Sequence, residues 1–291
     1  MEKKCFVALL MVVVMMCACW TGVLAEDVER EAFTSGDYEY ALLDDGTIGI
    51  TGYKGSADRL AIPAKLDGKA VTSIGDRAFF LCNSLTSVSI PDSVEQIGTN
   101  PFAVCSALKT ISVSPEHPYF ATIDGVLFRK ADKILIAYPA GIKSTTYSIP
   151  YGITTIGDSA FYKCSSLKSV TIPDTVTSIG NDAFYWCSSL TSIAIPDSVT
   201  SIENSAFLSC YSLTSVTIPH SVTSIGDSAF IGCDSLTSII ISDSVTSIGD
   251  SAFSYCPDLT LTVPRNSYAA EYAKTNNIPY TYPDANDWLN N

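Results

Sequence analysis

Charged side chains are scarce in this 291-residue chain: Asp, Glu, Lys and Arg make up 16% of it, against about a quarter in an average soluble protein. Positive charge is the rarer sign, with 17 Lys and Arg against 30 Asp and Glu and a formal net charge of −13. Phosphate backbones and anionic membranes bind to basic faces. The deficit therefore excludes nucleic acid and an anionic membrane surface as expected partners.

Residues and motifs of enzymatic chemistry are also scarce. The chain has two histidines, His117 and His220, and it has no Gly-rich phosphate loop, H-E-x-x-H motif or C-x₂-C motif. Serine recurs so often that a Ser/His/Asp combination carries no information. We therefore predict a protein that is not an enzyme, with no catalytic residues and no cofactor or metal site.

One long apolar run is present, at the N-terminus. Two lysines precede residues 5–20, which are all apolar, and Ala25 supplies a small residue for cleavage. This pattern predicts a secretory signal peptide over residues 1–25, cut after Ala25. A lipoprotein signal ending at Cys19 is the alternative. No second such run follows, so we expect no membrane insertion after signal removal and a secreted or cell-surface location.

What the chain has in abundance is a 23-residue unit. Its clearest copy runs from Leu213 to Ser235, and Leu236 begins the next. A phenylalanine keeps this period with one gap of 59 residues, at Phe79, Phe102, Phe161, Phe184, Phe207, Phe230 and Phe253. A cysteine keeps it too, at Cys82, Cys105, Cys164, Cys187, Cys210, Cys233 and Cys256. Periods of this length indicate a solenoid, here of about seven coils, of α/β repeat type and dominated by β-structure.

Each unit predicts one coil of that solenoid. A short strand with Val216 and Ile218 facing inward ends at Pro219, which cannot donate to a ladder. Gly226 is expected to permit a turn, and Asp227 to cap a short helical turn that follows. The other inward-facing positions are Leu213, Val222, Ile225, Ala229, Phe230 and Cys233. One unit buries too little apolar surface to fold alone, so the units must stack.

The domain order follows from where the repeat starts, stops and is interrupted. After the signal peptide we predict a capping segment over 26–58, a solenoid over 59–265 and a C-terminal cap over 266–291. A hairpin with Asp45-Gly46 at its turn covers the first coil, and Ser267–Asn276 is helix-like, with Trp288 and Leu289 anchoring the end. A β-hairpin insert occupies 114–146, with apolar strands at 125–128 and 134–138, and the solenoid continues through it.

Two polar columns and the cysteine column have more than one interpretation. Identical columns point their Cβ bonds the same way, so we interpret the cysteines as small buried apolar residues rather than as disulfides. Carboxylates recur at Asp92, Asp174, Asp197 and Asp243, and again at Asp76, Asp158, Asp227 and Asp250. Calcium between coils is one reading of these columns. Helix caps and turns are the preferred one, because Thr99, Asn181, Asn204, Tyr151 and His220 occupy the same positions.

Function is expected where the unit departs from itself. Aromatic side chains next to the Phe and Cys columns form a candidate binding edge at Tyr162, Tyr185, Trp186, Tyr211 and Tyr255. Aromatic clusters are typical of interface hot spots and of sugar stacking. The alternative is that these rings only shield the core.

The pattern L-x-S-V-x-I-P-x-S-V-x-S-I-G-x-x-A-F-x-x-C resembles the BspA-type leucine-rich repeat, and Ile123–Phe128 followed by Tyr138–Gly141 is similar to a hairpin of that family. The resemblance spans about residues 38–265. It implies a secreted or surface-displayed protein, and for some members an adhesin. We therefore expect a monomeric adhesin or protein-interaction module whose partner is an extracellular protein or glycan. A carbohydrate-binding solenoid and a structural spacer are the alternatives.

Overall fold

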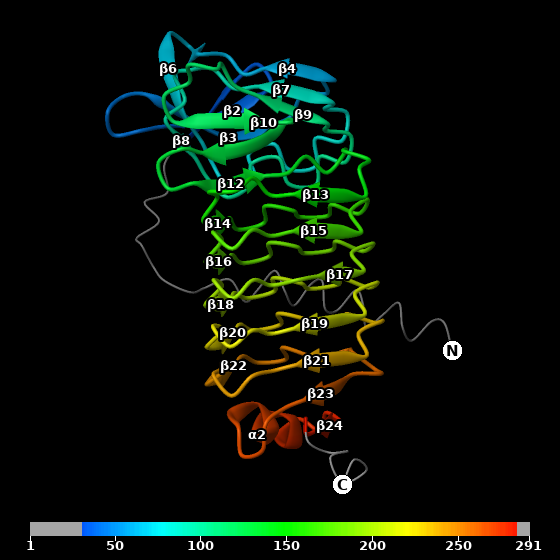
Figure 1. The fold of residues 1–291 in the computed structure, drawn as a ribbon. Helices are drawn as coiled ribbons and strands as arrows, with labels where there is room; N and C mark the ends of the chain where they lie inside the picture. Colours follow the sequence, from blue (N-terminus) through cyan, green and yellow to red (C-terminus); the bar gives the residue numbers. More distant parts are fainter. Residues whose placement is uncertain (1–30, 284–291) are drawn as a thin grey trace, which may run out of the picture. The chain divides into compact units, whose positions relative to one another are not determined.

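The computed structural model describes residues 31–283, and residues 33–283 form a stack of coils (Figure 1). Each regular coil contributes two short strands. Strands of successive coils pair in parallel with a register step of 23 residues, as Ser169 with Ser192 and Ile179 with Ile202. Paired strands lie about 4.8 Å apart, which sets the rise of the stack per coil. The β-solenoid expected from the repeat is confirmed.

The first ladder carries the Leu-x-x-Val strands of the unit and is interrupted once. Its N-terminal section is β4 (Arg59–Ala61), β7 (Ser87–Ser89) and β9 (Thr110–Ser112). Its C-terminal section is β13 (Thr146–Ser148), β15 (Ser169–Thr171), β17 (Ser192–Ile193), β19 (Ser215–Thr217), β21 (Ser238–Ile240), β23 (Thr260–Thr262) and β24 (Tyr280–Thr281).

The second ladder carries the Thr-Ser-Ile strands and is interrupted at the same place. Its N-terminal section is β3 (Ile48–Tyr53), β6 (Lys69–Ile74) and β8 (Gln96–Ile97). Its C-terminal section is β12 (Ile134–Ala137), β14 (Thr155–Ile156), β16 (Ser178–Ile179), β18 (Ser201–Ile202), β20 (Ser224–Ile225) and β22 (Ser247–Ile248). The short β5 (Lys65–Leu66) pairs antiparallel with β6.

The third side of each coil is made of turns, where a short helical turn was predicted. In every coil of the Phe column except that of Phe102, two residues have left-handed backbone angles. One is the residue after the Asp position, such as Ser228 with φ 57°, and the other is the second residue after Phe, such as Trp186 with φ 57°. A right-handed helix needs consecutive negative φ values, so it cannot form here. The predicted helical turn is therefore wrong.

The Asp column before Ala-Phe joins coils instead of capping helices. Asp227 Oδ1 accepts the backbone N–H of Asp250 at 2.8 Å, and Asn204 Oδ1 accepts that of Asp227 at 2.7 Å. Among the described coils, the step from Asn181 to Asn204 lacks this bond, and Asn181 Nδ2 donates back to Asp158 Oδ1 at 3.3 Å. In each case the side-chain oxygen accepts an N–H of the next coil in place of a backbone carbonyl oxygen. Asp and Asn both have this oxygen, so either residue can occupy the column.

The glycine before that column serves close approach between coils and not the turn. Gly226 does not have positive φ. A Cβ on it would lie 2.6 Å from the backbone nitrogen of Asn204 in the preceding coil. The predicted role of Gly226 is corrected accordingly.

Aromatic rings stack along the interior in two runs. Phe161, Phe184, Phe207, Phe230 and Phe253 succeed one another at centroid distances of 4.9 to 5.6 Å. Tyr138 precedes Phe161 at 5.2 Å, and Tyr272 follows Phe253 at 6.0 Å. Tyr53, Phe79 and Phe102 form the N-terminal run. The apolar core follows these runs as two clusters, which divide within the insert: Phe128 and Leu135 belong to the C-terminal cluster, and Leu127 and Ile136 to the N-terminal one.

The seven cysteines of the described residues are free, and all but Cys256 are buried. Their thiols also form hydrogen bonds that the sequence interpretation omitted. Cys210 Sγ donates to the carbonyl oxygen of Phe184 at 3.2 Å, and Cys187 Sγ to that of Phe161 at 3.1 Å. Burial raises the pKa of Cys187 to about 12, so its thiol keeps the proton that it donates.

The insert contains three strands where two were predicted. β10 (Phe120–Ile123) pairs antiparallel with β11 (Val126–Arg129), and β11 with β12. β12 then pairs in parallel with β14 and so returns to the solenoid. β8 and β9, however, end their sections of the two ladders. The coils continue through the insert, but their ladders do not.

A hairpin precedes the first coils and a helix follows the last ones. β2 (Tyr38–Leu42) pairs antiparallel with β3 around Asp45-Gly46, and β1 (Ala32–Ser35) lies beside β2. At the other end α2 (Tyr268–Thr275) is capped by Ser267, whose side chain accepts the N–H of Ala270. None of the helices within residues 31–283 has the length and the apolar character that a membrane span requires. The predicted signal peptide, Trp288 and Leu289 lie outside the described residues.

Candidate binding surface

Two tyrosines of the predicted binding edge stack on each other. Tyr162 and Tyr185 directly follow the Phe column in adjacent coils, so their backbones repeat at one coil's rise. Their rings lie 4.6 Å apart with planes at 6°. Burial raises the pKa of both phenols, so both stay protonated hydrogen-bond donors.

Trp186 extends the stack to the next coil. Its ring meets Tyr185 edge to face at 5.9 Å, and its Nε1 donates to the hydroxyl of Tyr211 at 2.7 Å. Lys163 Nζ lies 4.1 Å from the centroid of the Trp186 ring, a cation–π contact. Tyr162, Tyr185, Trp186 and Tyr211 thus form one contiguous half-buried group, which we call the aromatic cluster.

Tyr255 does not join the aromatic cluster. It occupies the same position of its unit as Trp186 but 69 residues later, which is three coils away and therefore roughly 14 Å along the stack. Its side chain is 71% exposed. The structure separates it from the other four predicted residues.

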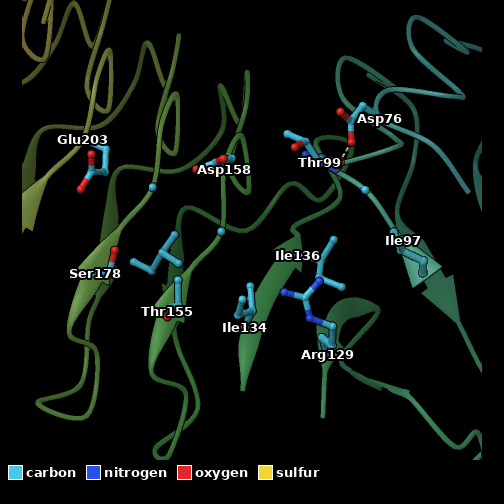
Figure 2. A pocket seen from close by; sticks show the side chains of 15 residues that line it. Asp76, Ile97, Thr99, Arg129, Ile134, Ile136, Thr155, Asp158, Ser178 and Glu203 are labelled. Atoms are coloured by element: carbon cyan, nitrogen blue, oxygen red, sulfur yellow. Dashed lines mark hydrogen bonds between the residues drawn. The ribbon is translucent and has the colours of Figure 1, made fainter. Parts of the chain in front are cut away.

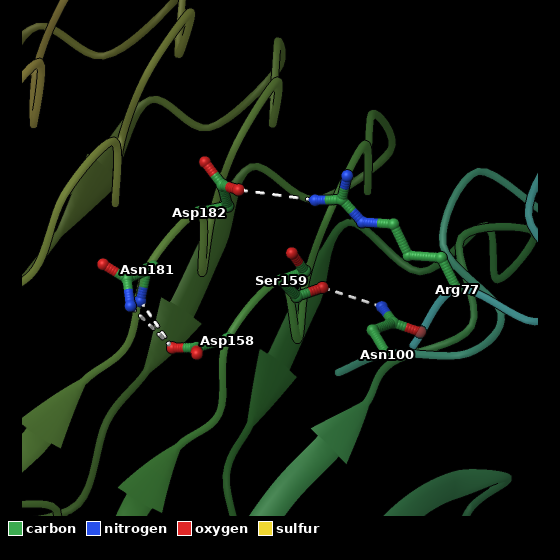
Figure 3. Close-up of polar contacts among 6 residues, drawn as sticks. All are labelled: Arg77, Asn100, Asp158, Ser159, Asn181 and Asp182. Carbon is green, nitrogen blue, oxygen red and sulfur yellow. Dashed lines mark hydrogen bonds and ion pairs between the residues drawn. The ribbon is translucent and has the colours of Figure 1, made fainter. Parts of the chain in front are cut away.

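An ion pair that the sequence did not reveal supports the aromatic cluster. Arg77 Nη2 lies 3.5 Å from Asp182 Oδ2 (Figure 3). The guanidinium also faces the Tyr162 ring at 5.5 Å. Burial raises the pKa of Asp182 to about 6, although the charge of Arg77 acts against this rise. Beside the pair, Asn100 Nδ2 donates to the carbonyl oxygen of Ser159 at 2.7 Å (Figure 3). Arg77 and Asp182 stand at a position where most other units have serine. That departure from the repeat is the signal by which the sequence could have indicated them.

A cleft of about 310 Å³ opens beside Trp186 and Tyr211. Lys143 and Lys163 line it together with three serines, Ser106, Ser165 and Ser188. This places two cations and several hydroxyls around an aromatic ring in a chain of strongly negative net charge. The cleft suits a ligand that has both an apolar face and polar or anionic groups.

The histidines have structural surroundings. His117 is fully buried, its Nδ1 accepts the backbone N–H of Tyr119 at 3.2 Å, and its Nε2 lies 3.2 Å from the carbonyl oxygen of Pro91. His220 is exposed and lies 3.5 Å from Asp243. Within residues 31–283 no group of three or more His, Cys, Asp and Glu side chains is arranged to hold a metal ion.

Comparison with known proteins agrees with this architecture. The family model for the BspA type leucine rich repeat region matches in six copies, over residues 65–138 and 137–260. A leucine rich cell surface protein from Faecalibacterium prausnitzii A2-165 shares the fold with a TM-score of 0.57 and 27% identity, over 84% of this chain and 97% of that one. No curated protein sequence matches the chain.

Two more distant structures share the fold alone. A leucine-rich repeat protein from Eubacterium ventriosum has a TM-score of 0.55 and 21% identity, over 79% of this chain and 82% of that one. The pneumococcal vaccine antigen PcpA has a TM-score of 0.53 and 17% identity, over 87% of this chain and 97% of that one.

Proposed function

Because the chain belongs to the family of BspA type leucine-rich repeat proteins, we propose that it is a non-enzymatic binding protein of the cell surface that holds an extracellular protein through the aromatic cluster. The family and its solenoid fold indicate an interaction or surface role, and the similar F. prausnitzii structure is described as a cell surface protein. Adhesion is the finer role that this proposal assigns. A monomer is sufficient for it, because the cluster lies within one chain.

The observation that carries the proposal is the continuity of the aromatic cluster. Three half-buried rings in ring-to-ring contact, joined through the Trp186–Tyr211 hydrogen bond, form a pre-ordered anchor. Rigid Tyr and Trp side chains lose little conformational entropy on binding and dominate interface energetics. The serine and threonine columns, by contrast, repeat with few changes from coil to coil and so offer little that could encode specificity.

Binding measurements against host matrix proteins and microbial surface proteins test the proposal. We expect the double variant Tyr185→Ala/Trp186→Ala to weaken binding by at least about tenfold, the usual scale for hot-spot residues. Tyr255→Ala is the matched control, because it removes an exposed ring three coils away. Equal affinity of the double variant and the control would refute the site.

Carbohydrate is the second candidate ligand, favoured by the cleft at Trp186 with its lysines and serines. A glycan array decides it: hits that vanish with Trp186→Ala support it, and an empty array removes it. If neither protein nor glycan binds, the remaining function is a structural spacer.

Export is proposed to use residues 1–25 as a signal peptide that is cleaved after Ala25. Sequencing of the mature N-terminus tests this: Glu26 is the expected first residue, and any other, such as a lipid-modified Cys19, would contradict cleavage after Ala25.

A further inference from the structure

The insert leaves one coil without a corner. In the regular coil, five residue steps lead from Ile156 in β14 to Phe161 in the ring stack. In the coil of the insert, Leu135 pairs with Ile156, and Tyr138 takes the ring position after only three steps. The Gly-Asp-Ser corner that projects from other coils is therefore missing here.

A cleft of about 430 Å³ lies at this place (Figure 2). Gly98, Thr99 and Asn100 line it on the N-terminal side, Ile134 and Ile136 of the insert contribute apolar surface, and β14 and β16 line the C-terminal side. Its volume falls within the range of about 300–1,000 Å³ typical of ligand sites. It is separate from the aromatic cluster, none of whose residues lines it.

A strand edge without a partner borders the cleft. Ile97 of β8 corresponds to Ile156, Ile179, Ile202 and Ile225, whose carbonyl oxygens accept an N–H from the next coil at 2.8 to 3.2 Å. β8 pairs with β6 and with no other strand among residues 31–283. The edge of β8 at Ile97 that faces the insert therefore has no neighbouring strand. Such edges are templates for an added strand.

The charge of the cleft is negative. Asp76, Asp158 and Glu203 follow one another along one side of it, as Figure 2 shows, and Arg129 enters from the insert. Arg129 is paired through two nitrogens with Asp132, at 2.8 and 2.7 Å, so its charge is locally compensated. A ligand for this cleft therefore needs positive charge.

Glu203 occupies the cleft at a structural cost. It stands in the glycine column, where a Cβ points at the preceding Asp-type residue, and next to it the ladder bond between Asn181 and Asn204 is missing. The backbone N–H of Glu203 donates to the carbonyl oxygen of Ile179 at 3.2 Å, whereas the equivalent hydrogen bonds of Gly226 and Gly249 are 2.8 Å long. Glycine would therefore give a more stable coil at this position. The carboxylate of Glu203 adds a negative charge to the cleft that glycine could not provide.

We propose that this cleft binds an extended, basic peptide segment of a partner protein, which adds as a strand to the open edge of β8. Backbone groups of the peptide pair with Ile97, and its Lys or Arg side chains lie against Glu203, Asp158 and Asp76. Strand addition at a sheet edge takes affinity from main-chain hydrogen bonds and specificity from alternate side chains. The inference is independent of the aromatic cluster.

Fluorescence anisotropy with a labelled (Lys-Val)₄ peptide tests the proposal on the purified chain. We expect Glu203→Gln to weaken binding about threefold to fivefold, as befits one partly solvated charge pair. Asp197→Asn, which removes an equal charge outside the cleft, should have no such effect. A peptide N-methylated at alternate residues should bind at least about tenfold more weakly, because it lacks the donors of a strand.

Two further measurements separate strand addition from unspecific attraction to an acidic protein. Binding should slow amide hydrogen exchange at Ile97, and Glu203→Gly should bind more weakly although it unfolds at higher urea. The Tyr185→Ala/Trp186→Ala variant should bind the peptide normally, so failure here is distinct from failure of the proposed function. Unchanged affinity of the N-methylated peptide, equal effects of Glu203→Gln and Asp197→Asn, or an unprotected Ile97 would each overturn the proposal.

Discussion

At the residue scale, polar side chains form hydrogen bonds that connect neighbouring coils. Cys thiols donate to Phe carbonyl oxygens, and Asp and Asn oxygens accept backbone N–H groups, each from a neighbouring coil. A buried carbonyl or amide without a partner costs about 1–3 kcal/mol, so these side chains protect the turns, where strand pairing is absent. Asp182 is the exception, because its half-buried carboxylate faces the Arg77 side chain.

Asp182 should make the stability of the protein depend on pH. Its pKa rises from 3.8 to about 6 in the folded chain. The folded state therefore binds a proton between about pH 4 and 6 that the unfolded state has released, and stability falls as pH rises through this window. We expect Asp182→Ser, which installs the residue of neighbouring coils, to remove this loss and to raise stability at pH 7 by about 1–2 kcal/mol.

Urea unfolding midpoints at pH 4 and pH 7 measure this effect. The variant and the parent should differ little at pH 4, where Asp182 is largely protonated in the folded chain, and most at pH 7. Asp197→Ser is the control, because Asp197 is exposed. A constant difference between variant and parent across the range would show that burial of the charge is not the cause.

At the element scale, coil-to-coil distance rather than turn geometry decides where glycine is needed. Gly226, Gly180 and Gly249 have ordinary φ values, but a Cβ on any of them would meet the preceding coil at 2.3 to 2.6 Å. Trp186 and Tyr255, conversely, adopt left-handed φ without being glycine, at a cost of about 1 kcal/mol each. The left-handed conformation is kept at these positions because the turns of neighbouring coils have the same shape and pack against each other.

Substitution of two glycines distinguishes the two roles. Gly226→Ala should lower stability by more than about 2 kcal/mol, because backbone atoms of Asn204 and Glu203 must move. Gly232→Ala should cost only about 1 kcal/mol, since its φ is 68° but nothing lies nearer than 3.5 Å to the added carbon. Urea midpoints provide the comparison, and equal losses would mean that close approach is not the dominant constraint.

At the scale of the whole molecule, the solenoid must end its ladders. Helix α2 packs its buried Ala269 and Ala273 on the last coils, and the hydroxyl of Tyr272 donates to the carbonyl oxygen of Gly249 at 3.3 Å. Helix α2 therefore covers the end of the second ladder, beyond β22. Uncovered ends of solenoids expose apolar coils and unpaired strands, which promote association.

Ala273→Asp should therefore cause the chain to associate. The carboxylate cannot stay in the fully buried position of Ala273, so α2 should detach and expose the last coil. Size-exclusion chromatography with light scattering should detect dimers or larger species. Lys274→Asp, an exposed change in the same helix, should elute as the parent does, and an unassociated Ala273→Asp variant would contradict the capping role.

The period and the inward-facing columns were legible in the sequence because they are local: Val216, Ile225, Phe230 and Cys233 recur every 23 residues, and all four are buried. What lies beyond one period was not legible. Arg77 meets Asp182 across 105 residues, and Ile97 borders a cleft with Glu203, because the insert shortens one coil and leaves its corner empty. The repeat alone thus determined the period of the coils and their inward-facing core, but not the conformation of their turns. Only the tertiary structure decided which departures from the repeat come together, since that depends on how the coils stack around the one that breaks the pattern.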